Sequence, residues 1–144
     1  STARWLTSAR GRGRADMAAR NNELLASRMK KLKVVTGHKE AIFCAVLDHT
    51  GRRLFTGSDD HTIKVWEVAS ARLYATCRGH CDSINEISVS PDNTMVASSS
   101  VDMRIRVWDL NGMPLAVLVG HTGSVMRAHF SPTANDGARY LVST

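Results

Sequence analysis

From residue 32 onward, apolar residues come in short runs that are separated by turns rich in Asp, Gly, Ser and Asn. Such runs predict short strands, because the helices of a globular domain need longer periodic segments. The run at 41–47 is apolar at nearly every position, and a turn at 48–51 ends it. A sheet with one face in water would alternate apolar and polar residues more cleanly. We therefore expect sheets that are covered on both faces by neighbouring sheets.

The runs repeat along the chain with a period of about 42 residues. An acidic turn and an alternating strand that ends on tryptophan occupy residues 58–66 and again 100–108, which places Trp66 and Trp108 42 residues apart. A period of this length with four short strands per unit is typical of the blades of a β-propeller. Three Gly-His pairs keep the same step: Gly37-His38, Gly79-His80 and Gly120-His121.

The predicted fold class is all-β, a β-propeller fragment preceded by a basic arm with a short helix. The repeats fill residues 32–144, as units of about 32–77 and 78–119 and an incomplete unit at 120–144. A closed propeller needs about 4–8 blades. Two complete blades and part of a third are therefore expected to belong to a longer protein.

The N-terminal region, residues 1–31, differs from the repeats in composition and charge. Residues 1–14 are rich in Arg, Gly and Ser without periodicity, and 16–29 have a helical composition with Asp16 as a candidate N-cap. The whole chain has a net charge of +6, of which residues 1–33 carry +7 and the rest −1. A basic arm can contact nucleic acid or an acidic partner. A solvated lead-in is favoured over direct nucleic-acid binding, because no aromatic residues are interleaved as in single-strand binders.

The three cysteines, Cys44, Cys77 and Cys81, are too few and too irregular for a disulfide framework and fit a reducing, intracellular compartment. Cys77, His80 and Cys81 superficially resemble a metal cluster, but no second ligand pair follows at zinc-finger distance. The repeat already accounts for His80. We therefore expect no metal and no cofactor. No apolar run approaches the roughly 20 residues of a membrane span, so no membrane association is expected.

Each full unit carries the same four polar residue types, which fit one hydrogen-bond relay. The Asp carboxylate can hold one imidazole nitrogen, the second nitrogen can accept from the Ser hydroxyl, and the Ser oxygen can accept from the indole N–H. Such a relay would lock the Gly-His loop onto the inner strands. The two predicted structural tetrads are His38, Ser58, Asp60 and Trp66, and then His80, Ser100, Asp102 and Trp108.

Ser, His and Asp are also the residue types of a nucleophilic triad. The set occurs twice at one spacing, whereas an enzyme needs one site, and the Ser does not lie in a Gly-x-Ser-x-Gly elbow. We therefore expect no catalytic residue and no enzyme activity.

Four arginines could form a phosphate site or lie on a solvated strand face. The solvated face is favoured, because Arg104 and Arg106 alternate with apolar residues along a strand. The four are Arg52, Arg53, Arg104 and Arg106.

Two types of loop should emerge on the same rim of a propeller. Lys39 and Asp82 follow the Gly-His loops, while Asp59 and Val101 precede the turn aspartates. Loops on a rigid scaffold carry most recognition. These four residues are the candidate contacts for partner proteins.

Over residues 32–144 the Gly-His pairs, the turn aspartates, Trp66-Glu67 and Trp108-Asp109 resemble WD40 repeats. The first unit departs from the family pattern only by having Glu67 for the terminal Asp. The resemblance implies a WD40 β-propeller fragment that acts as a non-catalytic protein-interaction scaffold.

A closer resemblance is to the bromodomain and WD-repeat proteins, the family of the PH-interacting protein. That family implies a nuclear, otherwise cytoplasmic, protein that is associated with chromatin, transcription regulation, cell shape and ubiquitin-ligase recruitment. Its bromodomain residues are not in this sequence, and Asn111 stands where the cullin-binding Trp-Asp-x-Arg element has Arg. The alternative is a generic WD40 adaptor, such as a ubiquitin-ligase substrate receptor or a cytoskeletal assembly factor. The segments that carry the closer resemblance are 54–60, 93–97, 105–108, 114–118, 129–132 and 139–144.

Overall fold

The computed structural model describes residues 2–6, 31–132 and 140–144, and this part of the chain consists of strands and turns without a helix. The helix expected at 16–29 lies outside the described residues. In the same described part, no helix is long and apolar enough to cross a membrane.

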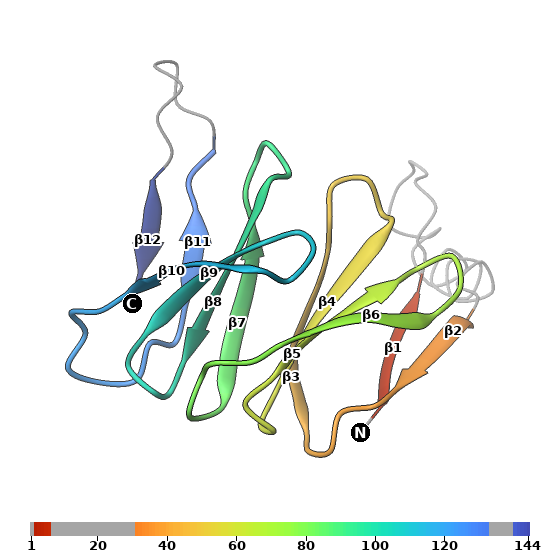
Figure 1. Ribbon diagram of the computed structural model, residues 1–144, viewed down its shortest axis with the longest axis horizontal. Helices are drawn as coiled ribbons and strands as arrows, with labels where there is room; N and C mark the ends of the chain where they lie inside the picture. The colour runs from red at the N-terminus through yellow and green to blue at the C-terminus, as the bar shows by residue number, and fades with distance from the viewer. Residues whose placement is uncertain (1, 7–30, 133–139) are drawn as a thin grey trace, which may run out of the picture.

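Two four-stranded antiparallel sheets form the centre of the molecule (Figure 1). The first runs in the order β3 (Ile42–Leu47), β4 (Arg53–Ser58), β5 (Ile63–Glu67) and β6 (Arg72–Cys77). The second repeats this order with β7 (Ile84–Val89), β8 (Met95–Ser100), β9 (Ile105–Asp109) and β10 (Pro114–Leu118). Each sheet is a meander in which consecutive strands pair, as expected for a propeller blade.

A two-stranded sheet lies on either side of this pair. On one side β1 (Thr2–Leu6) pairs antiparallel with β2 (Lys31–Thr36), and on the other β11 (Ala128–Phe130) pairs with β12 (Leu141–Ser143). The expectation that residues 1–14 form an arm without regular structure is wrong for Thr2–Leu6. The pairing uses backbone groups, which is why the composition of this segment gave no sign of it.

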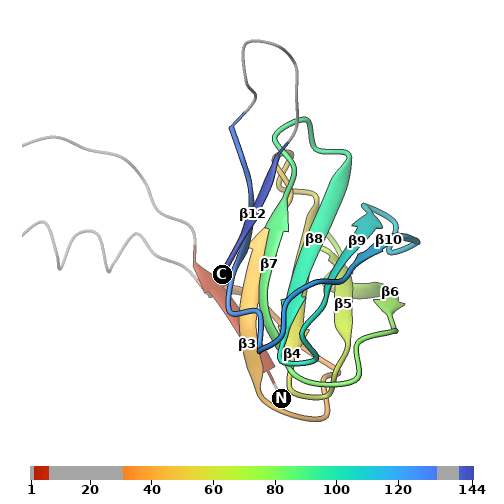
Figure 2. The same cartoon turned by 90° about the vertical axis from the view of Figure 1, so that its left-hand side faces the viewer.

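The first strands of successive sheets are neighbours, β3 beside β7 and β7 beside β11. Figure 2 shows β3 and β7 along one side of the molecule and β6 and β10 on the opposite side. The sheets are thus stacked face to face, with their first strands together. The second strands β4 and β8 are buried along almost their whole length, as expected of sheets that are covered on both faces. The expectation is wrong for β3, the run from which it was drawn, because β3 alternates half-buried and exposed residues at the inner edge of its sheet.

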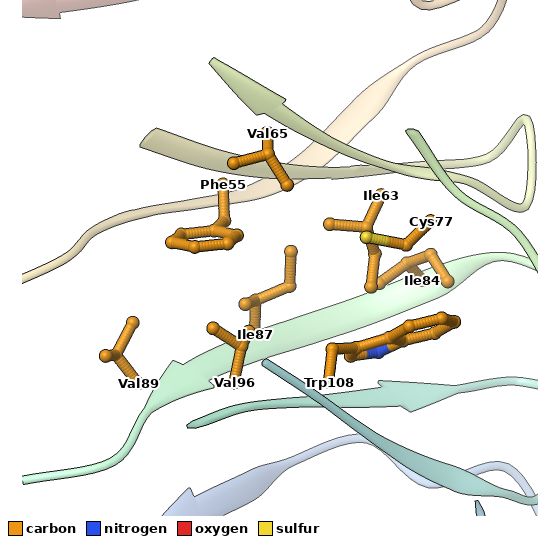
Figure 3. Packing of buried hydrophobic residues seen from close by; sticks show 9 residues of the cluster. All are labelled: Phe55, Ile63, Val65, Cys77, Ile84, Ile87, Val89, Val96 and Trp108. Atoms are coloured by element: carbon orange, nitrogen blue, oxygen red, sulfur yellow. The ribbon is translucent and has the colours of Figure 1, made fainter. Parts of the chain in front are cut away.

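The main core lies between the two four-stranded sheets (Figure 3). Phe55, Val65 and Cys77 come from the first sheet, and Ile87 and Trp108 come from the second. A smaller cluster around Val35 and Trp66 joins β2 to the first sheet. In both repeats the tryptophan therefore packs toward the strands that precede its own sheet.

The repeat also holds at the level of the backbone. The inner strands β3 and β7 change register at matching positions, between Ile42 and Cys44 and between Ile84 and Glu86. His61 and Met103, which follow the turn aspartates, both have positive φ, 62° and 64°. Residues of one 42-residue unit thus predict the backbone conformation of the next.

Candidate functional site

The first relay joins the loop after β2 to the interior of the first sheet. His38 lies with its Nδ1 2.9 Å from Asp60 Oδ2 and its Nε2 2.8 Å from Thr56 Oγ1. The indole Nε1 of Trp66 donates to the same hydroxyl oxygen at 2.8 Å. Because the carboxylate can only accept, Nδ1 carries the proton and Nε2 accepts from the hydroxyl. The chain of bonds runs from the surface turn to the buried tryptophan.

The second relay has the same geometry 42 residues later. His80 Nδ1 lies 2.7 Å from Asp102 Oδ2, and its Nε2 lies 2.9 Å from Ser98 Oγ. Trp108 Nε1 donates to Ser98 Oγ at 2.9 Å. The backbone N–H of Cys81 donates to the same Asp102 oxygen at 3.0 Å, as that of Lys39 does to Asp60. Each relay therefore fixes the Gly-His loop that connects one sheet to the next.

The hydroxyl in each relay is not the predicted one. Thr56 and Ser98 hold the position that the sequence analysis gave to Ser58 and Ser100. The strand pairing explains this, because Thr56 is the β4 residue opposite Lys64, two residues from Trp66 on the same face. A hydroxyl residue ten positions before each tryptophan was the available signal.

Ser58 and Ser100 have a different role, at the turn after the second strand. Ser58 Oγ accepts from the N–H of Asp60, and Ser100 Oγ accepts from the N–H of Asp102, both at 3.1 Å. Ser100 Oγ also donates to the carbonyl of Asp82 at 3.2 Å. These hydroxyls shape the turn that presents the carboxylate to the histidine.

The electrostatics favour a charged carboxylate in both relays and a neutral His80 in the second. Burial acts to raise the pKa of Asp60, but hydrogen bonds from Thr62 Oγ1, from the N–H of Lys39 and from His38 outweigh it and lower that pKa. The pKa of Asp102 is lowered by the same kinds of bond against the same burial. Burial lowers the pKa of His80, although Asp102 acts in the opposite direction.

This arrangement offers no accessible nucleophile. Thr56 and Ser98 are fully buried, and each hydroxyl is engaged by both an imidazole and an indole. A triad needs a hydroxyl that can reach a substrate carbonyl. The chemistry that these groups can perform is the fastening of a loop to a sheet.

The candidate metal cluster is used in other ways. His80 has both ring nitrogens engaged within the relay, and Cys77 is buried in the core between the sheets, where burial raises the pKa of its thiol to about 11. Cys81 is exposed. Within the described residues no group of three or more His, Cys, Asp or Glu side chains could hold a metal ion.

The four predicted contact residues lie at the turns beside the two relays. Asp59 accepts a hydrogen bond from Ser83 Oγ, and Asp82 Oδ1 accepts from the N–H of Ser83 at 2.8 Å. The N–H of Val101 donates to the carbonyl of Ser83 at 3.1 Å, while its side chain stays partly exposed. The structure therefore brings Asp59, Asp82 and Val101 together around Ser83, across the junction between the two sheets.

Lys39 belongs to the neighbouring loop. Its side chain is exposed, and its N–H is bonded to Asp60, the residue after Asp59. All four predicted residues thus lie in the loops and turns that follow β2, β4, β6 and β8, next to the His and Asp residues of the two relays. Ser83 was missed because it matches Ala41 in the first unit and so gave no repeated signal.

A second set of contacts ties the sheets together at the turns after β3 and β7. The N–H of His49 donates to Asn93 Oδ1 at 2.9 Å, and His49 Nε2 lies 3.0 Å from the carbonyl of Ser90. Asp48 shapes its own turn by accepting from the N–H groups of Arg52 and Arg53. The sequence predicts the turn at 48–51 but gives no sign of its contacts with Ser90 and Asn93.

Two of the four arginines are half-buried and make specific contacts. Arg53 lies 4.4 Å from the centre of the Tyr74 ring and donates to Asn111 Oδ1 at 2.8 Å, which links the first sheet to the turn after β9. Arg106 packs against Gly79, and its Nε is buried. Only Arg52 and Arg104 keep the exposed position expected of them.

Comparisons with known proteins agree with this geometry. The sequence pattern of the family described as WD domain, G-beta repeat, matches residues 29–67 and 71–109. The chain is 42% identical over 123 residues to a bromodomain and WD repeat-containing protein of Dictyostelium discoideum, and 35% identical over 85 residues to WD repeat and SOCS box-containing protein 1 of Takifugu rubripes. These alignments cover 82% and 57% of the chain but only 6% and 20% of the relatives. The solved structure of U3-55K superposes with a TM-score of 0.66 at 25% identity, over 68% of this chain and 32% of that one.

Proposed function

This chain belongs to the WD40 repeat family, and we propose from this that it is part of a protein-interaction scaffold. Its partner proteins bind the rim, that is, the turns beside the relays that carry Lys39, Asp59, Asp82 and Val101. WD40 repeat domains are typically non-catalytic and generally mediate protein interactions. The observation that carries the proposal is the recurrence of one buried relay in two successive blades, each fastening the loop next to the rim. A pre-organised loop loses little conformational entropy on binding.

The rim has the mixed chemistry of a protein contact. Asp59 and Asp82 supply carboxylates, Lys39 supplies a cation, and Val101 adds an apolar side chain that is 37% exposed. A few such residues around a partly apolar centre can carry much of the affinity of an interface. The proposed partners are therefore other proteins rather than nucleic acid or membrane.

The finer assignment rests on similarity. The first assignment is a chromatin-associated, nuclear protein that acts in transcription regulation and cell-shape control, as the resemblance of the sequence implies. The 42% identity to a bromodomain and WD repeat-containing protein supports the family on which this assignment rests. The alternative is a generic WD40 adaptor, such as a ubiquitin-ligase substrate receptor or a cytoskeletal assembly factor. The similarity to a WD repeat and SOCS box-containing protein supports only the WD repeats that such an adaptor would share. Since the chain spans only small parts of these relatives, the role of the whole protein is a proposal.

Site-specific photo-crosslinking in the intact protein tests the rim. A photoreactive phenylalanine analogue at Val101 is expected to form adducts with partner proteins in cell extract, whereas the same analogue at the exposed Arg72 on the edge strand β6 is the matched control. Chromatin proteins among the Val101 adducts would support the first assignment, and ligase components or their substrates the alternative. Equal adducts at both positions, or none at Val101, would refute the rim as a binding surface.

A further inference from the structure

A small recess opens beside the first relay. It has a volume of about 90 Å³ and is lined by six residues. Pockets that hold a whole small molecule are larger, roughly 300–1,000 Å³, so this one has room for a single chemical group. The lining residues are Gly37, Lys39, Asp60, Thr62, Lys64 and Arg78.

Three of the six lining residues are cationic. Lys39 and Arg78 are exposed, while Lys64 is only 9% exposed. The ammonium of Lys64 donates to Thr76 Oγ1 at 3.2 Å, a neutral oxygen, and within the described residues none of the three cations forms an ion pair. A buried ammonium is costly unless an anion balances it. The recess therefore carries an excess of positive charge at its base.

The carboxylate of Asp60 offsets one of the three positive charges of the recess, and within the described residues it forms no ion pair with any of the three cations. Its Oδ2 already accepts from His38 Nδ1 and from the N–H of Lys39, and its Oδ1 accepts from the N–H and hydroxyl of Thr62. These bonds occupy the carboxylate within its own loop and turn. An oxyanion in the recess would instead find the three cations, which have donors to spare.

The second blade lacks the same arrangement. Cys81 and Val119 stand at the positions equivalent to Lys39 and Arg78, and Arg106 replaces Lys64. The Arg106 guanidinium covers the loop glycine, since a Cβ atom at Gly79 would lie 2.7 Å from Arg106 Nη1. The recess is thus not a necessary product of the blade fold, and the first unit has a cationic set of its own.

We propose that this basic recess binds one oxyanion side chain, a carboxylate or a phosphate, of an acidic peptide segment in a partner protein. The inference rests on the proposed scaffold function and names the chemistry of one contact on its rim. A peptide is favoured over nucleic acid because the recess admits a single oxyanion group and no aromatic residue lines it. Strand binders need a continuous basic groove with stacking platforms.

The test uses the intact protein and three degenerate peptide libraries that differ only in a central phosphoserine, glutamate or serine. Fluorescence polarisation should give about tenfold tighter binding for at least one acidic library than for the serine library, as expected for a charge-assisted hydrogen-bonded pair. Tighter binding of the phosphoserine library assigns a phosphopeptide, and tighter binding of the glutamate library assigns a carboxylate. Equal affinity for all three libraries would overturn the proposal.

Charge variants locate the effect. The double substitution Lys39→Glu/Arg78→Glu should reduce acidic binding to the serine level, and Lys64→Met, which keeps an apolar chain of similar length, should do the same. Arg104→Glu is the control, because Arg104 is an exposed cation beside the second turn aspartate. Retained preference in the double variant, or an equal loss in Arg104→Glu, would contradict a specific recess.

Two further outcomes separate this inference from others. If the double variant loses binding to single-stranded RNA while the peptide libraries show no preference, the recess is a nucleic-acid contact and the proposal is wrong. If no peptide preference is found but adducts still form at Val101, only the inference falls and the scaffold function stands. A preference for acidic peptides without adducts at Val101 would instead support binding at the recess and refute partner contacts at Asp59, Asp82 and Val101.

Discussion

Thr56 and Ser98 are the residues on which the two relays depend most. Each is fully buried, and each hydroxyl oxygen lies within 2.9 Å of both a histidine nitrogen and a tryptophan nitrogen. Removing one hydroxyl takes a hydrogen-bond partner away from two buried polar groups. A buried group that loses its partner costs more than the bond itself contributes.

Thr56→Val, which keeps the shape of the side chain, should therefore lower the free energy of unfolding by about 1–3 kcal/mol, because His38 Nε2 and Trp66 Nε1 lose their common partner. Ser58→Ala is the matched comparison and should cost less, since Ser58 Oγ accepts only the N–H of Asp60 in its turn. Urea denaturation of the intact protein measures both. A larger loss in Ser58→Ala would contradict the relay described above.

Acidification should weaken the fold in two stages. The folded-state pKa of His80 is lowered from its ordinary value of 6.5, so the folded form disfavours the proton and stability is lost as the pH falls below that value. The pKa values of Asp60 and Asp102 are lowered from 3.8, so a second loss begins below that value. The sign is the same in both stages, because in each the unfolded chain binds more protons.

Free energies of unfolding measured from pH 8 to pH 3 check this dependence. His80→Asn, which does not titrate, should show a smaller slope below pH 6.5 than the wild type. A protein that becomes more stable between pH 6.5 and pH 4 would show that the charged histidine is the favoured form.

The sequence could predict the types of residue in the relays but not which hydroxyl closes them. His38, Asp60 and Trp66 repeat 42 residues later as His80, Asp102 and Trp108, and the structure brings both sets together. Two hydroxyl positions repeat equally well, at eight and at ten residues before the tryptophan. Only the pairing of β4 with β5 decides between them, and that register is a property of the folded sheet.

At the scale of the strands, Gly57 shows how closely the sheets approach. A Cβ atom at this position would lie 2.6 Å from both Cys44 Sγ and Ile84 Cγ2. Cys44 belongs to the same sheet and Ile84 to the next one, so the glycine lies at the junction between the two. A side chain here would have to separate them.

Gly57→Ala should consequently destabilise the protein by about 1–3 kcal/mol through overpacking. Gly123→Ala is the control, because a Cβ atom there would meet no described atom within 4 Å. Thermal unfolding of the two variants makes the comparison. Equal melting temperatures would mean that the sheets are free to move apart.

The strands themselves follow the sequence pattern well where the apolar runs are bounded by turns. The run expected at 41–47 differs from β3 (Ile42–Leu47) by one residue at its start, and the strands expected to end on the two tryptophans are β5 (Ile63–Glu67) and β9 (Ile105–Asp109), each one residue longer at its end. β1 was missed because a strand that pairs through its backbone alone needs no apolar pattern. The contact of Arg53 with Asn111 was missed for a different reason, since it joins segments that only the stacking of the two sheets brings together.

At the scale of the whole molecule, the residues that stabilise the fold differ from those that we propose bind partner proteins. Hydrophobic clusters join each sheet to the next, and the relays anchor the connecting loops to this core. The rim residues lie directly beside the relays but contribute little to the core. Val101 and Asp102 are adjacent in the chain and have opposite roles in this account, one in binding and one in stability.

The most direct test of this division compares Val101→Asp with Asp102→Ala in the intact protein, using the partner identified by crosslinking at Val101. The measurement is the dissociation constant at a temperature where both variants are folded, together with the free energy of unfolding. We expect Val101→Asp to weaken binding at least tenfold with nearly unchanged stability, since substitutions at surface positions usually stay within about 0.5 kcal/mol. Asp102→Ala should lose about 1–3 kcal/mol of stability and weaken binding much less than Val101→Asp, because it loosens the loop beside the contact without removing the contact itself. Unchanged stability in Asp102→Ala, or unchanged binding in Val101→Asp, would contradict the account.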